Sequence, residues 1–182
     1  MNEKKRKGKK DTELRLISEL MRNSRRSDRE LAKALKVSQP TVTRIRTRLE
    51  EEGTIKEYTM IPHFGKLGVE IVAVTFGKWS PDRVKDPEST VFKEAKQFIT
   101  KHPSIVFGSA GNGLGKGTMV VTLHKTYTDY VEFITEARRK AVGLLTDVES
   151  FIISVKLDAM PRHFSLGNLM EYLNPASHDR IE

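Results

Sequence analysis

The sequence predicts an α+β protein of two small domains, with three helices in the first and a βαββαβ sheet in the second. Apolar residues recur at helical spacing up to about residue 53 and gather in short strand-like runs after residue 69. Residues 1–60 hold 17 Lys and Arg against 10 Asp and Glu, whereas the remainder holds 15 against 14. The hydrophobic fraction of 37% over 182 residues suits two modest cores better than one.

Composition excludes several classes of site. The chain has no cysteine, so disulfides, thiolate nucleophiles and zinc ribbons are excluded. No apolar run approaches the ~20 residues of a membrane span, and the start lacks the apolar core of a secretion signal, so we expect a cytoplasmic protein with no membrane partner. The net charge of +8 favours a polyanionic partner. Membrane surfaces are polyanions too, so charge alone does not select DNA.

The chain begins with a basic segment followed by a first helix. Residues 1–10 contain six Lys or Arg and no large apolar residue after Met1, which predicts a disordered basic arm. Such an arm could contact phosphates or serve only as a solubilising tail. Asp11 is the expected N-cap of the helix, whose apolar stripe is Leu14, Ile17, Leu20 and Met21.

Two further helices follow, joined by a tight turn at Val37. Ser27 and Glu30 have the spacing of a capping box, which opens a helix with Leu31, Ala32 and Leu35 facing inward. Ser38 is the expected N-cap of the next helix and Gly53 its stop, with Val42, Ile45 and Leu49 on its inner face. Residues 11–53 therefore predict a helix-turn-helix domain whose last helix is free to enter a DNA major groove.

The outer face of the last helix carries guanidinium groups and short hydroxyls, which suit base edges and phosphates. A plain solvated helix face is the alternative, and the two preceding helices favour DNA. We assign to the groove Ser38, Gln39, Thr41, Thr43, Arg44 and Thr47. We assign to phosphates Arg46, Arg48, Arg25, Arg26 and the amino-terminal lysines.

The second half has the period of a sheet domain. Residues 54–68 are predicted to form a strand, 54–61, and a linker. From Val69 we expect a buried strand to Trp79, a helix striped from Val91 to Ile99, strands at 104–109 and 118–125, a helix striped from Tyr130 to Ala137, and a strand at 148–157. This βαββαβ order, within 69–158, is the ferredoxin-like arrangement with both helices on one sheet face. The open face predicts a homodimer, because a second copy would cover it.

The segment ISELMRNSRRSDRELAKALKVSQPTVTRIRTRLEEEGTIKEYTMIPHFGKLG resembles the DNA-binding half of the Lrp/AsnC family of transcriptional regulators. Shared features include the Asn-Ser turn, Ser27, the ELA triplet at Glu30, Thr41-Val42, Tyr58 and Leu67-Gly68. One departure is that Ile45 and Arg46 stand in the reverse of the family's usual order. The resemblance implies an ACT/RAM-like second domain and sequence-specific binding to pseudo-palindromic double-stranded DNA as a dimer or higher oligomer.

In the Lrp/AsnC family, amino-acid effectors bind near the turn that corresponds to SAGNGLGKGT. The resemblance therefore implies that the effector-binding residues are Gly108, Gly111, Asn112 and Gly113. The stretch from Gly108 to Gly117 contains no Asp or Glu, so either the small-molecule effector differs from an ordinary amino acid or there is none. The run does not have P-loop register, and we expect a flexible hairpin there with no nucleotide cofactor.

Two alternatives remain at this level. Proteins of this fold include sirohaem decarboxylase-like enzymes with a site lined by His and Arg, and a nonspecific architectural DNA-binding protein would also be basic. The five histidines are too scattered for a metal site by spacing, and we expect each on the surface or in a loop: His63, His102, His124, His163 and His178. The extension 159–182 has leucines at helical spacing from Leu166 to Leu173, which predicts a short amphipathic helix that docks on a subunit.

Overall fold

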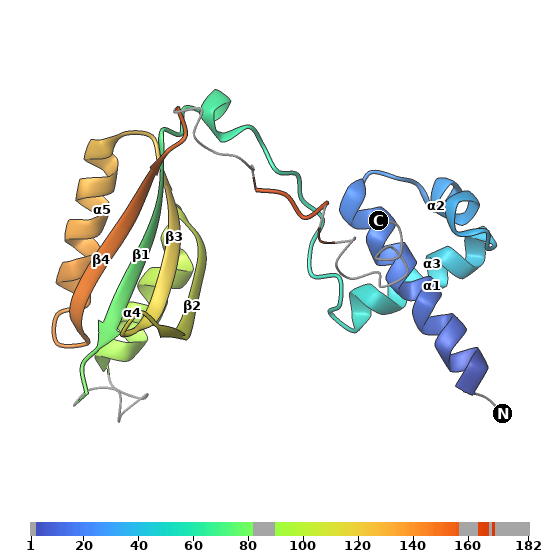
Figure 1. Ribbon diagram of the computed structural model, residues 1–182, viewed down its shortest axis with the longest axis horizontal. Helices are drawn as coiled ribbons and strands as arrows, with labels where there is room; N and C mark the ends of the chain where they lie inside the picture. The colour runs from blue at the N-terminus through green and yellow to red at the C-terminus, as the bar shows by residue number, and fades with distance from the viewer. Residues whose placement is uncertain (1–2, 82–89, 157–163, 168, 170–182) are drawn as a thin grey trace, which may run out of the picture. The chain divides into compact units, whose positions relative to one another are not determined.

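The computed structural model describes residues 3–81, 90–156, 164–167 and 169 (Figure 1). They divide into two compact units, one that contains the chain up to Ile61 and one that begins at Pro62. No helix in these described ranges is both long and apolar enough to cross a membrane. The predicted helix of the extension falls largely outside the described residues.

The first unit contains three helices, α1 (Glu3–Arg22), α2 (Asp28–Leu35) and α3 (Gln39–Glu51). The predicted caps are confirmed: Ser27 and Glu30 form a capping box at α2, and the Ser38 side chain accepts a hydrogen bond from the Thr41 backbone at the start of α3. Gly53 follows α3 with φ of 69°, a left-handed conformation in which glycine has no steric penalty. The core consists of Leu16, Leu20, Leu31, Ala32, Leu35, Val42, Ile45 and Leu49.

Three expectations for this unit are wrong. Residues 3–10 belong to α1 and are not a disordered arm, because Lys, Arg and Glu are strong helix formers and the packed turns behind them propagate the helix. Asp11 consequently lies inside α1 and does not cap it. Residues 56–63 have no regular structure in place of the predicted strand at 54–61, because no described strand lies beside them to supply a hydrogen-bond ladder.

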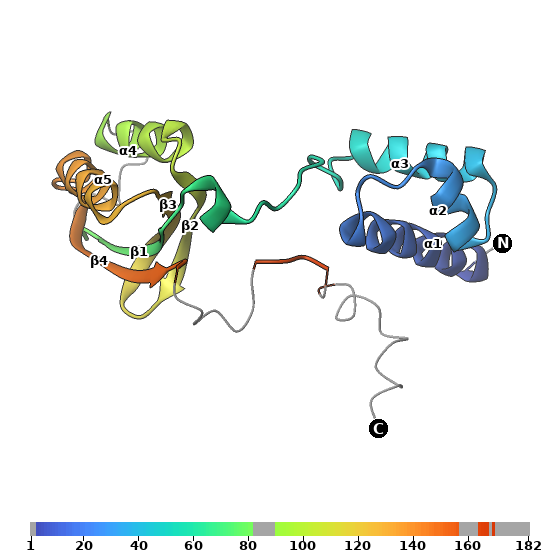
Figure 2. The same ribbon diagram turned by 90° about the horizontal axis from the view of Figure 1, so that it is seen from above.

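The second unit is the predicted ferredoxin-like sheet domain, preceded by the short helix η1 (Phe64–Leu67). Its elements in order are β1 (Ile71–Trp79), α4 (Thr90–Lys101), β2 (Ile105–Gly113), β3 (Lys116–His124), α5 (Tyr127–Lys140) and β4 (Leu145–Ser154). The strands are antiparallel in the order β2-β3-β1-β4. Figure 2 shows both helices on one face of the sheet, where their apolar sides enclose a core that includes Ile71, Ala73, Tyr130, Phe133 and Ile134.

The glycine-rich run forms the expected hairpin between β2 and β3, but most of the run is strand. Strands β2 and β3 continue until Gly113 pairs with Lys116, which leaves only Leu114 and Gly115 as the turn. Both turn residues have positive φ, 54° and 67°, as a two-residue type I′ hairpin requires. The backbone of this glycine-rich run therefore extends strands β2 and β3 and does not interrupt the sheet.

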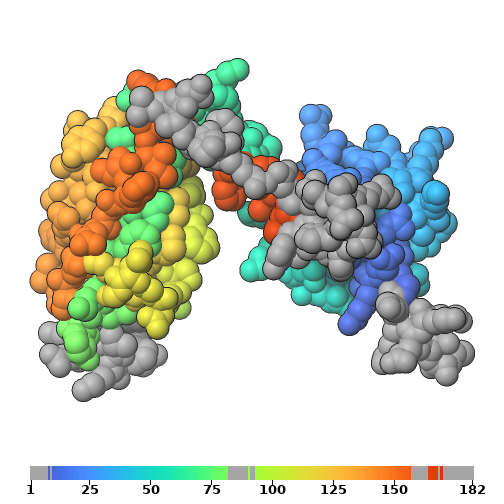
Figure 3. All heavy atoms as spheres, viewed as in Figure 1, coloured from blue at the N-terminus to red at the C-terminus, as the bar shows by residue number. Residues whose placement is uncertain are grey.

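The face of the sheet that carries no helix is mostly apolar. By the strand register, it holds Ser109 and Glu149 and the apolar residues Val72, Val74, Phe76, Phe107, Met119, Val121, Leu123, Phe151 and Ile153. Figure 3 looks onto this face, with β4 in orange beside β1 in green. The Phe107 and Phe151 side chains are 52% and 66% exposed, so in a single chain large apolar groups meet solvent.

Candidate nucleic-acid interface

The apolar stripe of α3 fixes which side of the helix faces out. Val42, Ile45 and Leu49 are 0%, 5% and 3% exposed, whereas Arg44 and Thr47 are exposed. Ile45 thus fills the core at the position where the family usually has Arg. The reversed order of Ile45 and Arg46 therefore keeps the stripe intact and turns Arg46 toward the side of the helix.

The predicted groove residues lie on or beside the exposed face of α3. Gln39, Thr43, Arg44 and Thr47 are exposed, and the Arg44 guanidinium has no hydrogen-bond or ion-pair partner among the described residues. Ser38 Oγ lies 2.8 Å from Thr41 Oγ1 and accepts from the Thr41 backbone N–H, so this pair also forms the N-terminal cap. The structure thus gathers the six candidates at the start and along the outer side of one helix.

Arg46 is held within the protein. Its Nη2 lies 3.1 Å from Asp28 Oδ1 and donates a 3.2 Å hydrogen bond to the Arg26 carbonyl. The guanidinium carbon also lies 5.9 Å from the centre of the Tyr58 ring. The other Asp28 oxygen, Oδ2, accepts a 2.6 Å hydrogen bond from the Thr43 hydroxyl. Asp28 therefore joins α2 to α3 through both carboxylate oxygens.

Tyr58 ties the segment that follows α3 back to that helix. Its hydroxyl donates a 2.6 Å hydrogen bond to Glu50 Oε1. Partial burial, with this hydrogen bond to a carboxylate, raises the pKa of Tyr58 to about 12. The phenol therefore stays protonated and able to donate over the whole physiological pH range.

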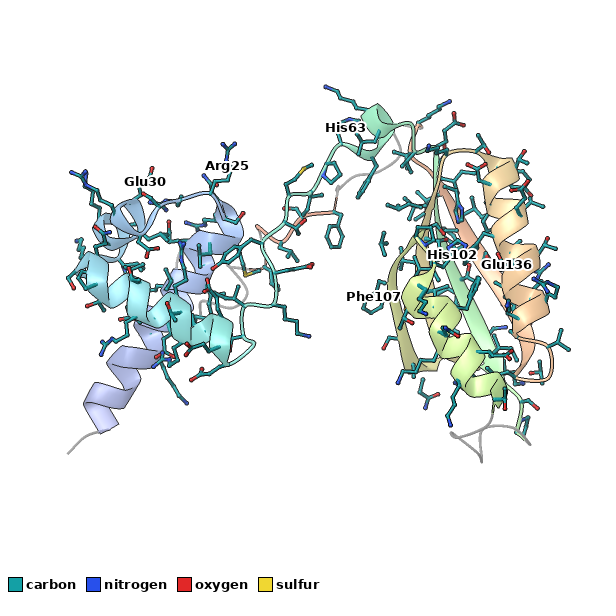
Figure 4. All side chains as sticks on the ribbon, turned by 180° about the vertical axis from the view of Figure 1, so that it is seen from behind. Arg25, Glu30, His63, His102, Phe107 and Glu136 are labelled. Carbon is teal, nitrogen blue, oxygen red and sulfur yellow. The ribbon has the colours of Figure 1, made fainter. Side chains whose placement is uncertain are left out.

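Two further arginines assigned to phosphates are also paired. Arg48 contacts Glu13 on α1 and lies 3.6 Å from Glu52, and Arg26 contacts Glu19 on α1. Glu52 stands at i+4 from Arg48, which is helical spacing, whereas Glu13 is far from Arg48 in sequence and Glu19 lies across a turn from Arg26, so helical spacing alone gave no sign of these two carboxylates. Arg25, in contrast, is exposed and extends away from the helices in Figure 4.

Sequence reasoning missed a second set of exposed cations, on α2 and just after it. Arg29, Lys33 and Lys36 are exposed, on positions that the buried stripe of α2 leaves facing outward. The inward positions of Leu31, Ala32 and Leu35 would have been enough to find them.

Comparisons with known proteins agree with this geometry. A model of winged helix-turn-helix DNA-binding domains matches residues 9–56. An uncharacterised HTH-type transcriptional regulator of Pyrococcus abyssi is 38% identical over 146 residues, which are 78% of this chain and 95% of that protein. The HTH-type transcriptional regulator LrpC of Bacillus subtilis is 34% identical over 95 residues, 52% of this chain and 60% of that one.

The crystal structure of an AsnC family transcriptional regulator from Agrobacterium tumefaciens matches with a TM-score of 0.67 at 15% identity, over 85% of this chain and 95% of that one. The chain belongs to the Lrp/AsnC family of transcriptional regulators. The family resemblance and fold class expected from the sequence are thereby confirmed. Because the relatives are named as transcriptional regulators, they do not favour the sirohaem decarboxylase-like enzyme.

In this Lrp/AsnC chain the glycines assigned to an effector lie in β2. Gly108 packs against α4, where an added Cβ would lie 2.9 Å from Ile99 Cγ2, whereas Gly111 and Gly113 face open space. A cavity of about 80 Å³ lies instead between the sheet and the helices α4 and α5. Its walls are apolar, with Trp79, Phe98 and Phe133 among them, and the effector candidates from Gly108 to Gly113 do not line it.

The histidines of the Lrp/AsnC chain occupy different environments. His63 is exposed, whereas His124 is 4% exposed on the helix-covered side of β3, so its expected place at the surface is wrong. The alternation of β3 turns His124 inward, where its Nε2 lies 2.8 Å from Thr122 Oγ1 and burial lowers its pKa. The His102 and His124 rings lie 5.0 Å and 5.2 Å from the Phe133 ring.

The two remaining histidines, His163 and His178, lie outside the described residues. Within the part of the chain that the structure describes, no three His, Asp or Glu side chains gather closely enough to hold a metal ion.

Proposed function

We propose that this Lrp/AsnC regulator reads DNA through the exposed face of α3. The observation that carries the proposal is the position of Arg44, which projects unpaired from a helix whose opposite side is fixed in the core. A guanidinium has the fork of donors that matches guanine O6 and N7 in the major groove. Gln39, Thr43 and Thr47 beside it would reach neighbouring base edges, with Ser38 and Thr41 at the entrance of the helix.

The phosphate contacts would come from the free cations. Arg25 precedes α2, and Arg29, Lys33 and Lys36 line the outside of that helix and its end, where a helix-turn-helix crosses the DNA backbone. Arg26, Arg46 and Arg48 would act differently. Moving Arg46 or Arg48 to a phosphate would remove the charge partner of a partly buried carboxylate, and moving Arg26 would leave Glu19 with only the 3.6 Å contact to Arg22. We propose that these three arginines position α3 and contribute little direct phosphate binding.

We propose that the binding unit is a homodimer formed through the open face of the sheet. The apolar side chains of this face form a contiguous patch, and patches of this kind mark protein interfaces. A two-fold pair would present two copies of α3, so the half-sites of a pseudo-palindrome would lie about 10 bp, or a multiple, apart. Because such a regulator must reach the genome, we propose a cytoplasmic location.

We infer that an ordinary amino-acid effector is not held at the Gly108–Gly117 stretch. This stretch has no carboxylate for a ligand ammonium group. Asp147 and Glu149 of β4 both contact Lys116 Nζ, the latter at 3.1 Å, and so share a single positive charge; they belong to β4 and not to this stretch. An effector of this regulator would need to lack the ammonium group or bind elsewhere.

A charge reversal on α3 tests the reading surface. Arg44→Glu should weaken binding of the full chain to duplex DNA at least tenfold, because it replaces a groove donor with a group that phosphates repel. Arg139→Glu on α5 is the matched control, an equal charge change at an exposed arginine of the sheet domain. Equal affinity of Arg44→Glu and Arg139→Glu, measured by fluorescence anisotropy, would remove α3 as the reading element.

A further inference from the structure

The hydroxyl group of Thr43 donates its hydrogen to an acceptor within the protein. Thr43 Oγ1 donates to Asp28 Oδ2 at 2.6 Å, and the Gln39 carbonyl lies 3.2 Å from the same oxygen. Both neighbours can only accept, since one is a carboxylate and the other a backbone carbonyl. A hydroxyl has a single hydrogen, and the bond to the charged oxygen is the shorter and stronger of the two. Whichever acceptor takes it, the hydrogen stays inside the protein.

The exposed side of Thr43 therefore offers only lone pairs. Thr43 is exposed on α3, one residue before Arg44. In general a threonine in the major groove can either donate to a base or accept from one, and so discriminates poorly. At this position the donor role is used up, so any hydrogen bond to a base edge must run from the base to Thr43.

Only two bases can make that bond. On its own strand, adenine presents the N6 amino group and cytosine the N4 amino group in the major groove, where thymine and guanine present the carbonyl oxygens O4 and O6. We propose that Asp28 makes Thr43 an acceptor-only reader that selects adenine or cytosine over guanine or thymine at one position of each half-site. This inference rests on the proposed function, because it requires α3 to lie in the groove.

The orientation of Asp28 is favoured from two sides. Its Oδ1 forms an ion pair with Arg46 Nη2 at 3.1 Å that does not have hydrogen-bond geometry, and Asp28 directly follows the Ser27 cap that begins α2. This arrangement dictates what an amide would do in its place. In Asp28→Asn the amide oxygen is expected to face the Arg46 cation, so the amide NH₂ faces Thr43 and donates to it. The Thr43 hydrogen then turns to the Gln39 carbonyl, 3.2 Å away, and still stays inside the protein, while the amide occupies one lone pair of Oγ1.

The first test compares Thr43→Val with Thr43→Ser in the full chain. The probe is the duplex that wild-type protein selects from random DNA, together with every single base-pair change in one half-site. At one position, wild-type protein and Thr43→Ser should bind adenine and cytosine on the same strand about equally well, and should prefer both over guanine and thymine on that strand by roughly 3- to 10-fold, the usual worth of one hydrogen bond. Thr43→Val keeps the shape and the methyl group, and should reduce that preference to less than about 2-fold at that position alone.

The second test is Asp28→Asn on the same duplexes. The preference for adenine or cytosine at the position that Thr43→Val identifies should weaken, because the amide occupies one acceptor site of Oγ1, and it should not change to guanine or thymine on that strand. The proposal is overturned if Thr43→Val changes no position, if adenine and cytosine on the same strand are not both preferred at the position it changes, or if folded Asp28→Asn prefers guanine or thymine on that strand. Should Asp28→Asn fail to fold in a thermal melt, the Thr43→Val and Thr43→Ser pair decides alone. If Arg44→Glu binds DNA weakly but Thr43→Val keeps all the base preferences of the wild-type protein, this inference is wrong and the proposed function still stands.

Discussion

Arg46 Nη2 lies 3.1 Å from Asp28 Oδ1, and this ion pair joins the last helix of the first unit to the one before it. Both side chains are only about a fifth exposed, so the pair is screened from solvent far more than a surface salt bridge. On the adjacent side of α3, Ile45 is packed in the core. The rotation of α3 about its own axis is therefore set by an apolar contact and an ionic contact together.

Removing this ion pair should destabilise the first unit. In Arg46→Met the Asp28 carboxylate keeps its Thr43 hydrogen bond but loses its charge partner, so we expect a loss of about 1–3 kcal/mol. Arg44 lies on the exposed face of the same helix and is unpaired, so Arg44→Met should change stability by less than about 0.5 kcal/mol. Urea unfolding followed by helix circular dichroism measures both variants, and equal stability of the two would mean that the ion pair contributes nothing.

Truncation of Arg44 should affect specific binding above all. If its guanidinium reads a guanine, Arg44→Ala should cost about 1–3 kcal/mol on the selected site and much less on random duplex. Titrations of both duplexes at one salt concentration compare the two losses. An equal loss on both would identify Arg44 as a phosphate contact and not a base reader.

A charge in the open sheet face should dissociate the dimer. Phe151 lies in β4 on that face and is exposed in the single chain, so Phe151→Asp would have to bury a carboxylate between two apolar surfaces. We expect a monomer by sedimentation velocity at concentrations where the wild-type chain is a dimer. Val142→Asp, an exposed residue after α5, is the control and should remain dimeric. Dimerisation of Phe151→Asp would place the interface on another surface.

The buried His124 should make the second unit sensitive to mild acid. Burial lowers the pKa of His124; Asp129 opposes this shift and His102 adds to it. In the folded state the ring therefore stays neutral at pH values somewhat below 6.5, its ordinary pKa. The unfolded chain takes up a proton at that ordinary value, and stability therefore falls as the pH drops below 6.5. His124→Gln, which can keep the Thr122 hydrogen bond, should lose less stability between about pH 7.5 and about pH 5.5 than wild type. His63→Gln should behave as wild type, and an equal loss in His124→Gln would contradict the account.

Local chemistry was enough to predict much of the first unit. The Ser27–Glu30 capping box, the Ser38 cap and the inward stripe of α3 all depend on successive residues three or four positions apart, and all three are confirmed. The partners of Arg46 and Arg48 could not be found this way, because Asp28 and Glu13 come from other helices. The packing of α1, α2 and α3 decides which charges meet.

The sheet domain shows the same limit. Its βαββαβ order followed from apolar runs. The expected glycine-rich hairpin is present, but β2 continues to Gly113, with a register shift after Ala110, beyond the strand end predicted at residue 109. Cross-strand hydrogen bonds to β3 override the weak strand propensity of glycine there. Similarly, the expected strand at 54–61 is unpaired, because a strand depends on a neighbour that its own sequence does not specify.

Selection from a random-sequence duplex pool tests the central claim most directly. The full chain should enrich a pseudo-palindromic motif whose half-sites lie about 10 bp, or a multiple, apart, and Arg44→Glu under the same conditions should enrich none. Failure of the wild-type chain to enrich any motif at low salt, or recovery of the same motif by Arg44→Glu, would contradict sequence-specific reading by α3.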